Sequence, residues 1–133
     1  MNQDVLFFFE SMPDAAFLYE ALEERIFSEI ENVNVRVQKT QITFTDPKVF
    51  ACASLLRVKK KSELPPVYLV VTFGLEHRVK SPRIAAATEA YPNRWTHHVV
   101  IASAEEIDEE LMGWIREAAE FSASKGRKKD GKR

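Results

Sequence analysis

Two adjacent histidines, His97 and His98, lie within the stretch RWTHHVVIAS at residues 94–103. Imidazole is the side chain that changes charge closest to neutral pH, and it serves as a general acid, a general base or a metal ligand. The apolar residues that follow the pair are β-branched and predict a β-strand, in which neighbouring side chains point to opposite faces. We therefore expect that the two rings neither bind one metal ion nor form a catalytic pair.

The remaining side chains offer little reactive chemistry. The other metal-ligating candidates, Cys52 and His77, are far apart in the sequence, so we expect no metal site. The four glycines form no phosphate-binding loop and no dinucleotide fingerprint, so we expect no cofactor. Acid–base catalysis is left only to His98, with Tyr68 or Lys39 as a partner. We assign no catalytic residue, lean toward a protein that is not an enzyme, and keep an enzyme based on His98 as the third hypothesis.

Helical periodicity at both ends of the chain and alternation in between predict an α+β fold. Apolar residues at helical spacing predict one helix over residues 14–30 and another that follows a capping pattern of Ser103 and Glu106. Alternating and β-branched stretches predict five strands, at residues 33–37, 41–44, 50–56, 67–73 and 96–102. Residues 82–90 are expected to form a short helix. The expected architecture is an antiparallel sheet of about five strands with the N-terminal and C-terminal helices packed on one face.

The alternation also predicts which side chains lie on the sheet face away from the helices. Every second residue from Val67 to Phe73 is apolar and should face the helices, and His97 falls on the same side, where we expect a structural role. With a bulge or turn near residues 38–40, the uncovered face receives Lys39, Gln41, Thr43, Tyr68, Thr72, Thr96 and His98. These groups suit an anionic or hydrogen-bonding ligand. The alternative is the ordinary solvated face of a half-buried sheet.

Charge is unevenly distributed along the chain. Residues 125–133, KGRKKDGKR, hold six of the 19 Lys and Arg residues and one of the 20 Asp and Glu residues. Residues 1–124 therefore carry a formal charge of −6, and we expect them to form one α+β domain followed by a basic, disordered tail. The alternative is a tail that lies on phosphates.

Two features predict a cytoplasmic protein without membrane contact. The single cysteine excludes an internal disulfide framework and suits a reducing compartment. The N-terminal stretch has no basic segment, and its apolar run of five residues is too short for a signal peptide or a membrane helix.

Several short motifs are spread over the chain. They are FF with Pro13 ahead of the first helix, KTQITF at residues 39–44, FA at 50–51, FGL and SPRI within 73–84, RWTHH at 94–98 and DEELMGWIREA in the last helix. In this order and spacing they resemble the bacterial and archaeal family DUF5655 over residues 7–121. The resemblance implies a stand-alone domain or an appended one, in some cases beside domains similar to nucleic-acid proteins, and so implies a binding role near nucleic acids.

The residues that match the family pattern overlap the polar face and add two arginines. The combined candidate ligand-binding set is Lys39, Gln41, Thr43, Tyr68, Arg83, Arg94 and His98. Our first hypothesis is a non-enzymatic binding module whose sheet face takes an anionic small molecule or nucleic acid. The second is a homo-oligomer or adaptor protein in which this face contacts protein.

Overall fold

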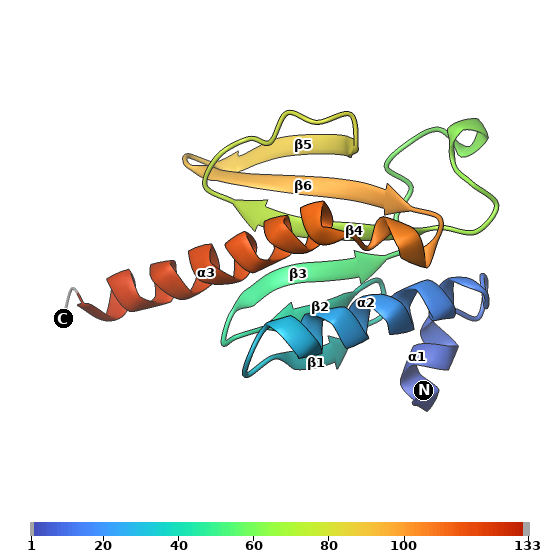
Figure 1. Cartoon of the computed structure of the whole chain (residues 1–133), viewed down its shortest axis with the longest axis horizontal. Helices are drawn as coiled ribbons and strands as arrows, with labels where there is room; N and C mark the ends of the chain where they lie inside the picture. The colour runs from blue at the N-terminus through green and yellow to red at the C-terminus, as the bar shows by residue number, and fades with distance from the viewer. Residues whose placement is uncertain (1, 132–133) are drawn as a thin grey trace.

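The computed structural model describes the backbone of residues 2–131 and the side chains of residues 2–124. The fold is α+β, with helices at both ends of the chain and one sheet between them (Figure 1). The helices are α1 (Gln3–Phe8), α2 (Ala15–Glu29) and α3 (Glu109–Gly131), with short 3-10 helices η1 (Lys61–Glu63) and η2 (Ala104–Glu106). The strands are β1 (Asn34–Val37), β2 (Ile42–Thr45), β3 (Val49–Ser54), β4 (Leu69–Leu75), β5 (Ile84–Tyr91) and β6 (Arg94–Ile101).

The described strands form a six-stranded sheet in the order β1-β2-β3-β4-β6-β5, and every neighbouring pair is antiparallel. The first four strands follow one another as a meander. The connection after β4 passes β6 and leads to β5 at the edge, and a two-residue turn at Pro92 and Asn93 returns the chain into β6. Strand β6 therefore lies between two strands that precede it in the sequence.

Strand β5 corrects one part of the sequence analysis, which expected a short helix over residues 82–90. Its alanines at positions 85–87 favour a helix by intrinsic propensity. Pairing along β6 overrides that preference, because a tight turn holds the two segments side by side and β6 would otherwise keep an open edge. The helix prediction is wrong, and the sheet has six strands where about five were expected. The expected fold class is otherwise confirmed.

Helices α2 and α3 cover one face of the sheet and bury the main hydrophobic core against it (Figure 1). Strand β4 contributes alternate apolar side chains to this face, and all of them are buried: Leu69, Val71, Phe73 and Leu75. The two helices contribute apolar residues at helical spacing, among them Leu22, Ile26, Leu111 and Ile115. The sequence prediction that both helices pack on one face is confirmed.

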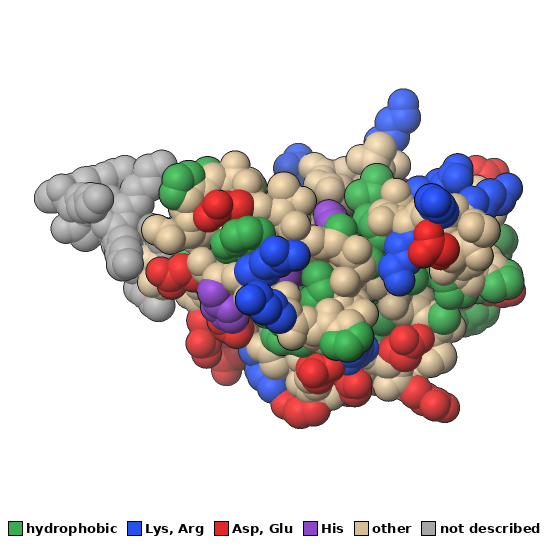
Figure 2. All heavy atoms as spheres, turned by 90° about the horizontal axis from the view of Figure 1, so that it is seen from above, with side chains coloured by type: hydrophobic (Ala, Val, Ile, Leu, Met, Phe, Trp, Pro, Cys, Tyr) green, Lys and Arg blue, Asp and Glu red, His purple; other side chains and the backbone are tan. Residues whose placement is uncertain are grey.

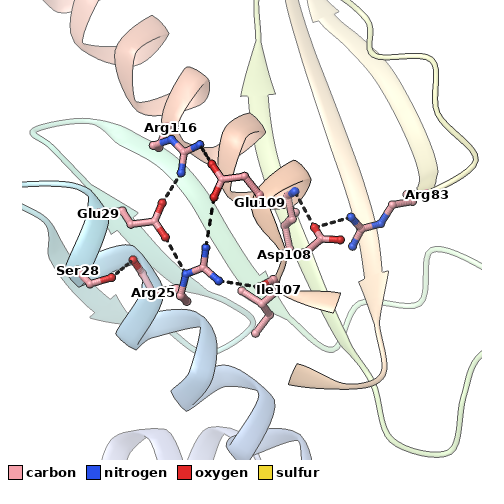
Figure 3. Close-up of polar contacts among 9 residues, drawn as sticks. Arg25, Ser28, Glu29, Arg83, Ile107, Asp108, Glu109 and Arg116 are labelled. Carbon is pink, nitrogen blue, oxygen red and sulfur yellow. Dashed lines mark hydrogen bonds and ion pairs between the residues drawn. The ribbon is translucent and has the colours of Figure 1, made fainter. Parts of the chain in front are cut away.

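Ion pairs join α2 to α3 within the helical layer that covers the sheet (Figure 3). Arg25 contacts Glu29 within α2 at 2.7 Å and reaches Glu109 of α3 at 3.8 Å. Arg116 of α3 contacts the same two carboxylates. Burial alone would raise the pKa of Glu29, but the hydrogen bonds and charges of Arg25 and Arg116 outweigh it and lower that pKa. These ion pairs link the two helices above the core that they share.

The predicted capping pattern forms, although it starts a different element from the one expected. Glu106 accepts hydrogen bonds from the backbone N–H groups of Ser103 at 3.1 Å and Ala102 at 2.7 Å, which caps η2. Helix α3 begins later, at a point where Asp108 accepts a hydrogen bond from the Leu111 N–H at 3.0 Å. The chain thus turns twice between the end of β6 and the last helix.

The backbone of α3 continues as a helix to Gly131, past the expected domain end at residue 124. Side chains of residues 125–133 lie outside the described part, so the expectations for the basic tail stay predictions. Within the described part of the chain, no helix is long and apolar enough to cross a membrane.

Candidate functional site

The sheet face turned away from α2 and α3, which we call the outer face, carries a row of polar residues across its central strands. Strand pairing places four of them next to one another: Thr43 of β2, Cys52 of β3, Thr72 of β4 and His98 of β6. Arg36 of β1 extends the row at one end. Side chains of register partners project from the same face with Cβ atoms about 5 Å apart, so neighbouring members of this row, such as Thr72 and His98, can contact one small ligand.

His98 is half-buried in this row and is held by Thr72. The Thr72 Oγ1 and His98 Nδ1 atoms are 2.8 Å apart and share a hydrogen bond. Burial lowers the pKa of His98, so the ring is neutral at pH 7. When the Thr72 hydroxyl donates to Nδ1, the neutral ring carries its proton on Nε2, where it is a donor. No carboxylate among the described residues hydrogen-bonds to this ring, so the orienting partner of an acid–base histidine is missing from them.

Arg94 approaches the same face from the turn between β5 and β6. Asn93 has a φ of 66°, a left-handed conformation that asparagine adopts more readily than most residues, and it allows the tight turn before Arg94. The Arg94 guanidinium lies directly over Gly74 of β4, because a Cβ added to that glycine would be 2.5 Å from Arg94 Cζ. A glycine inside a strand gives space for such a close approach.

The half-buried Arg94 guanidinium has no hydrogen-bond acceptor and no carboxylate partner within the part of the chain that the structure describes. Its charge reaches Cys52 of β3, on the far side of β4. Burial raises the pKa of the Cys52 thiol to about 11, although the charge of Arg94 acts in the opposite direction. The thiol therefore stays protonated and is a poor nucleophile. A positive charge fixed on a sheet without a counter-ion is an arrangement that a bound anion satisfies.

Of the seven predicted site residues, the structure places Thr43, Arg94 and His98 on the central part of the outer face. Thr43 is buried, and its hydroxyl is 3.4 Å from the Arg36 carbonyl to which it donates. The expected bulge or turn near residues 38–40 is a turn, closed by a backbone hydrogen bond from Gln38 to Gln41.

Lys39 and Gln41 lie at that turn, at the opposite end of the sheet from Arg94. Lys39 is exposed, whereas Gln41 is half-buried and its amide donates to the Gln38 side chain at 3.2 Å. The structure therefore does not bring these two residues to the Arg94 guanidinium.

Tyr68 and Arg83 also lie apart from the row. Tyr68 is buried just before β4, and its hydroxyl donates to the Leu55 carbonyl at 2.9 Å. Arg83 lies on the helix side of the sheet, where it donates to Asp108 at 2.8 Å (Figure 3) and to the Glu106 carbonyl at 2.7 Å. Its guanidinium satisfies carboxylates of the fold, in contrast to that of Arg94.

His97 points to the face opposite His98, as the alternation predicts. Its ring is fully buried and stacks on Phe73 with centroids 5.2 Å apart. Nε2 accepts a hydrogen bond from the Val79 N–H at 2.9 Å and so anchors the connection between β4 and β5. Nδ1 has no hydrogen-bond partner among the described residues. Burial lowers the pKa of His97, although the nearby backbone carbonyls of Phe73 and Trp95 favour the charged ring. Its role is structural.

Two residues of the site were missed by the sequence analysis. Cys52 was considered from the sequence only as a metal-ligating candidate, and Gly74 was not considered as part of a site. A glycine inside an apolar strand is a known signal of close backbone approach, so the stretch VYLVVTFGL did contain a hint of the Arg94 position. What no local pattern indicates is which side chain occupies that space.

The geometry limits the chemistry of the site. The described residues contain no group of three or more side chains that could hold a metal ion.

The model of one protein family, described as a domain of unknown function (DUF5655), matches residues 8–122. No curated protein and no solved structure matches the chain.

Proposed function

Because the chain belongs to the DUF5655 family, whose description assigns no activity, we propose a function from the site itself: a non-enzymatic binding module that holds a small anionic group on the outer face. Arg94 supplies the positive charge, and Thr72 and His98 supply hydrogen-bonding groups beside it. A phosphate or a carboxylate group is the ligand chemistry that these residues fit. A cytoplasmic location is part of the proposal, since one protonated thiol suits a reducing compartment.

The observation that carries the proposal is the contact between Arg94 and Gly74. A guanidinium on a protein surface usually finds a carboxylate or remains solvated at the end of a mobile side chain. Arg94 does neither: it is half-buried, it lies flat on the glycine, and no described residue accepts its hydrogen bonds. The five donors of such a group fit two oxygens of one anion.

A small anion fits the charge distribution better than nucleic acid does. Binding to nucleic acid relies on several Lys and Arg contacts to phosphates, whereas residues 1–124 carry a formal charge of −6. Figure 2 shows Asp and Glu side chains along its lower border, on the side of the helices. The remaining cations of the outer face, Arg36 and Lys39, lie on β1 and at its end, away from Arg94.

Gly74→Ala is expected to weaken binding of a small anion by at least about tenfold, the loss typical of a charge-assisted hydrogen-bond pair, while the fold is retained. The added methyl group would occupy the space below the guanidinium and displace it. The displaced atoms are the far end of a flexible side chain, so β4 itself need not move. Amide NMR titrations with inorganic phosphate, acetate and adenosine monophosphate, followed at Thr72 and His98, measure the effect.

Two further variants separate the site from general charge effects. Arg94→Gln should behave like Gly74→Ala, whereas Arg36→Gln, which removes the same charge from the other end of the row, should bind as the wild type does. The proposal is wrong if none of the three probes shifts the wild-type amides, or if both site variants bind normally. Binding of a twelve-residue oligothymidine without binding of phosphate would also contradict it.

Binding of sulfate is expected to strengthen as the pH falls from 7.5 to 5.5. The neutral His98 ring has a pKa below the usual histidine value, and an anion beside it would raise that pKa and so couple binding to proton uptake. If the pKa of His98 rises by about one unit when the anion is bound, the affinity increases by up to about tenfold at low pH. Sulfate keeps its own charge over this pH range. Isothermal titration at several pH values tests the wild type against His98→Gln, which should bind with little dependence on pH. An equal dependence in both would exclude His98 from the site.

A further inference from the structure

Large apolar side chains are exposed at one end of the molecule, on the first helix. Residues Gln3, Leu6 and Phe7 follow the spacing of one face of α1, and Glu10 comes two residues after the helix ends. Leu6 is 54% exposed and Phe7 is 63% exposed, although Val5 and Phe9 of the same segment are buried in the core. Residues 2–14 contain three carboxylates and no basic residue. Helix α1 therefore presents an apolar face on an acidic segment, with one cation from elsewhere, Lys39, in the hollow beside Asp4 and Phe7.

The connection between β3 and β4, residues 55–66, has the opposite character. It holds four exposed cations, Arg57, Lys59, Lys60 and Lys61, against one carboxylate, Glu63. None of these four cations forms an ion pair with a residue that the structure describes. Leu56, at the start of the connection, is 54% exposed. Figure 2 shows Lys and Arg side chains gathered at the right of the molecule, over this connection.

A hollow of about 290 Å³ lies beside these cations. It is lined by Met12, Arg57, Lys61, Leu64, Pro65, Pro66 and Tyr68. Five of its seven lining residues are apolar or aromatic and two are basic, so it suits an apolar side chain from a segment with negative charge. Two of the lining residues are held by hydrogen bonds, because Tyr68 donates to the Leu55 carbonyl and its backbone N–H contacts the Met12 sulfur at 3.5 Å.

The acidic helix and the basic connection lie at the same end of the molecule (Figure 1). Met12 lines the hollow and comes four residues after Phe8, where α1 ends. Figure 1 shows α1, the start of α2 and the connection with η1 at the same end of the molecule. A two-fold symmetric contact is self-complementary, and two patches of opposite charge at one end of the chain meet that condition, since each patch can meet the other patch of a second copy.

We propose that two copies of this chain associate through this end, with α1 of each copy on the β3–β4 connection of the other. Phe7 of one copy enters the hollow of its partner, and Asp4 and Glu10 face the cations of residues 57–61. A second copy fits this surface because the chain itself carries the matching segment, acidic and with an exposed aromatic residue. The surface is separate from the outer-face site at Arg94 and Gly74, and the proposal does not depend on that site.

Charge reversal on either patch is expected to break the dimer. Lys59→Glu with Lys61→Glu places acidic groups against acidic α1, and Asp4→Lys with Glu10→Lys places basic groups against the basic connection. Each double variant should weaken association of the full chain by at least about tenfold, measured by sedimentation velocity over a range of protein concentrations. An equimolar mixture of the two double variants should form a dimer again, because both contacts in the mixed pair join opposite charges.

The controls use exposed residues away from this end. Lys48→Glu with Lys80→Glu makes the same change in net charge and should leave the dimer intact, and so should Gly74→Ala. Phe7→Ser, which alters an exposed side chain, should give a folded monomer, with folding checked by circular dichroism. A wild-type chain that is monomeric at all concentrations would overturn the proposal. So would a dimer that survives both charge reversals, or a mixture of the two double variants that stays monomeric.

Discussion

Replacing Phe73 with alanine is expected to lower the free energy of unfolding by about 3–5 kcal/mol. Phe73 lies in β4, is 1% exposed, and is stacked on two other rings on the helix side of the sheet. Its ring centroid is 5.2 Å from that of His97 and 5.8 Å from that of Trp114 of α3. Truncation would leave a cavity where the sheet, α3 and the β4–β5 connection meet, and these rigid elements can close it only in part.

Urea unfolding monitored by far-ultraviolet circular dichroism measures this change. Phe17→Ala is the matched control, because Phe17 is 67% exposed on α2 and its truncation should alter the free energy of unfolding by no more than about 0.5 kcal/mol. Similar losses in the two variants would mean that Phe73 is not packed as described. A loss of less than about 1 kcal/mol for Phe73→Ala would lead to the same conclusion.

Acidification from pH 7.5 to pH 5.5 is expected to destabilise the protein through His97. Burial holds the pKa of this ring below its unfolded value of about 6.5, so the unfolded chain binds the proton more readily than the folded one. The contribution of the neutral His97 ring to the free energy of unfolding is complete above the pKa of the unfolded chain. It is lost as the pH falls through that value toward the pKa of the folded protein. Protonation would also turn Nε2 from an acceptor into a donor and break its hydrogen bond with the Val79 N–H.

Urea unfolding at the two pH values tests this expectation in the wild type, in His97→Gln, in His98→Gln and in the double variant that carries both substitutions. The glutamine at position 97 can accept the Val79 hydrogen bond and has no charge to gain, so its stability should depend less on pH. His98→Gln should remove a further part of the pH dependence of the free energy of unfolding, because the pKa of His98 is also lowered by burial. The lowered pKa values of Glu29 and Asp108 act at more acidic pH and leave this range unaffected. A wild type equally stable at both pH values, or a steep dependence retained by the double variant, would contradict the assignment.

The alternation of side chains along strands accounts for most of what the sequence predicted correctly. Strand β4 packs one face on the helices, so its apolar residues occupy every second position and identify the core. The same rule separated His97 from His98, and the structure places them on opposite faces of β6. The helices of the core were predictable for a related reason, since each buries one stripe of apolar residues.

The features that sequence reasoning missed depend on partners that are distant along the chain. The alanines of β5 carry no strand signal of their own, and only the open edge of β6 makes that segment a strand. Arg83 and Arg94 look alike in the sequence, yet one meets Asp108 and Glu110 whereas the other meets Gly74. The partner of a long charged side chain is set by the assembled fold, so the two arginines could not be assigned different roles from local patterns.

The insertion of β6 between β4 and β5 has a consequence for the order in which the chain can assemble as it is synthesised. Strands β1 to β4 are adjacent along the chain and pair as a meander as soon as they emerge. The far edge of β4 then stays unpaired until residues 94–101 have been made, although it is the most apolar strand of the sheet. An open apolar edge is a template for pairing with other chains. Nascent chains that stop before β6 should therefore be the form of this protein most prone to aggregate.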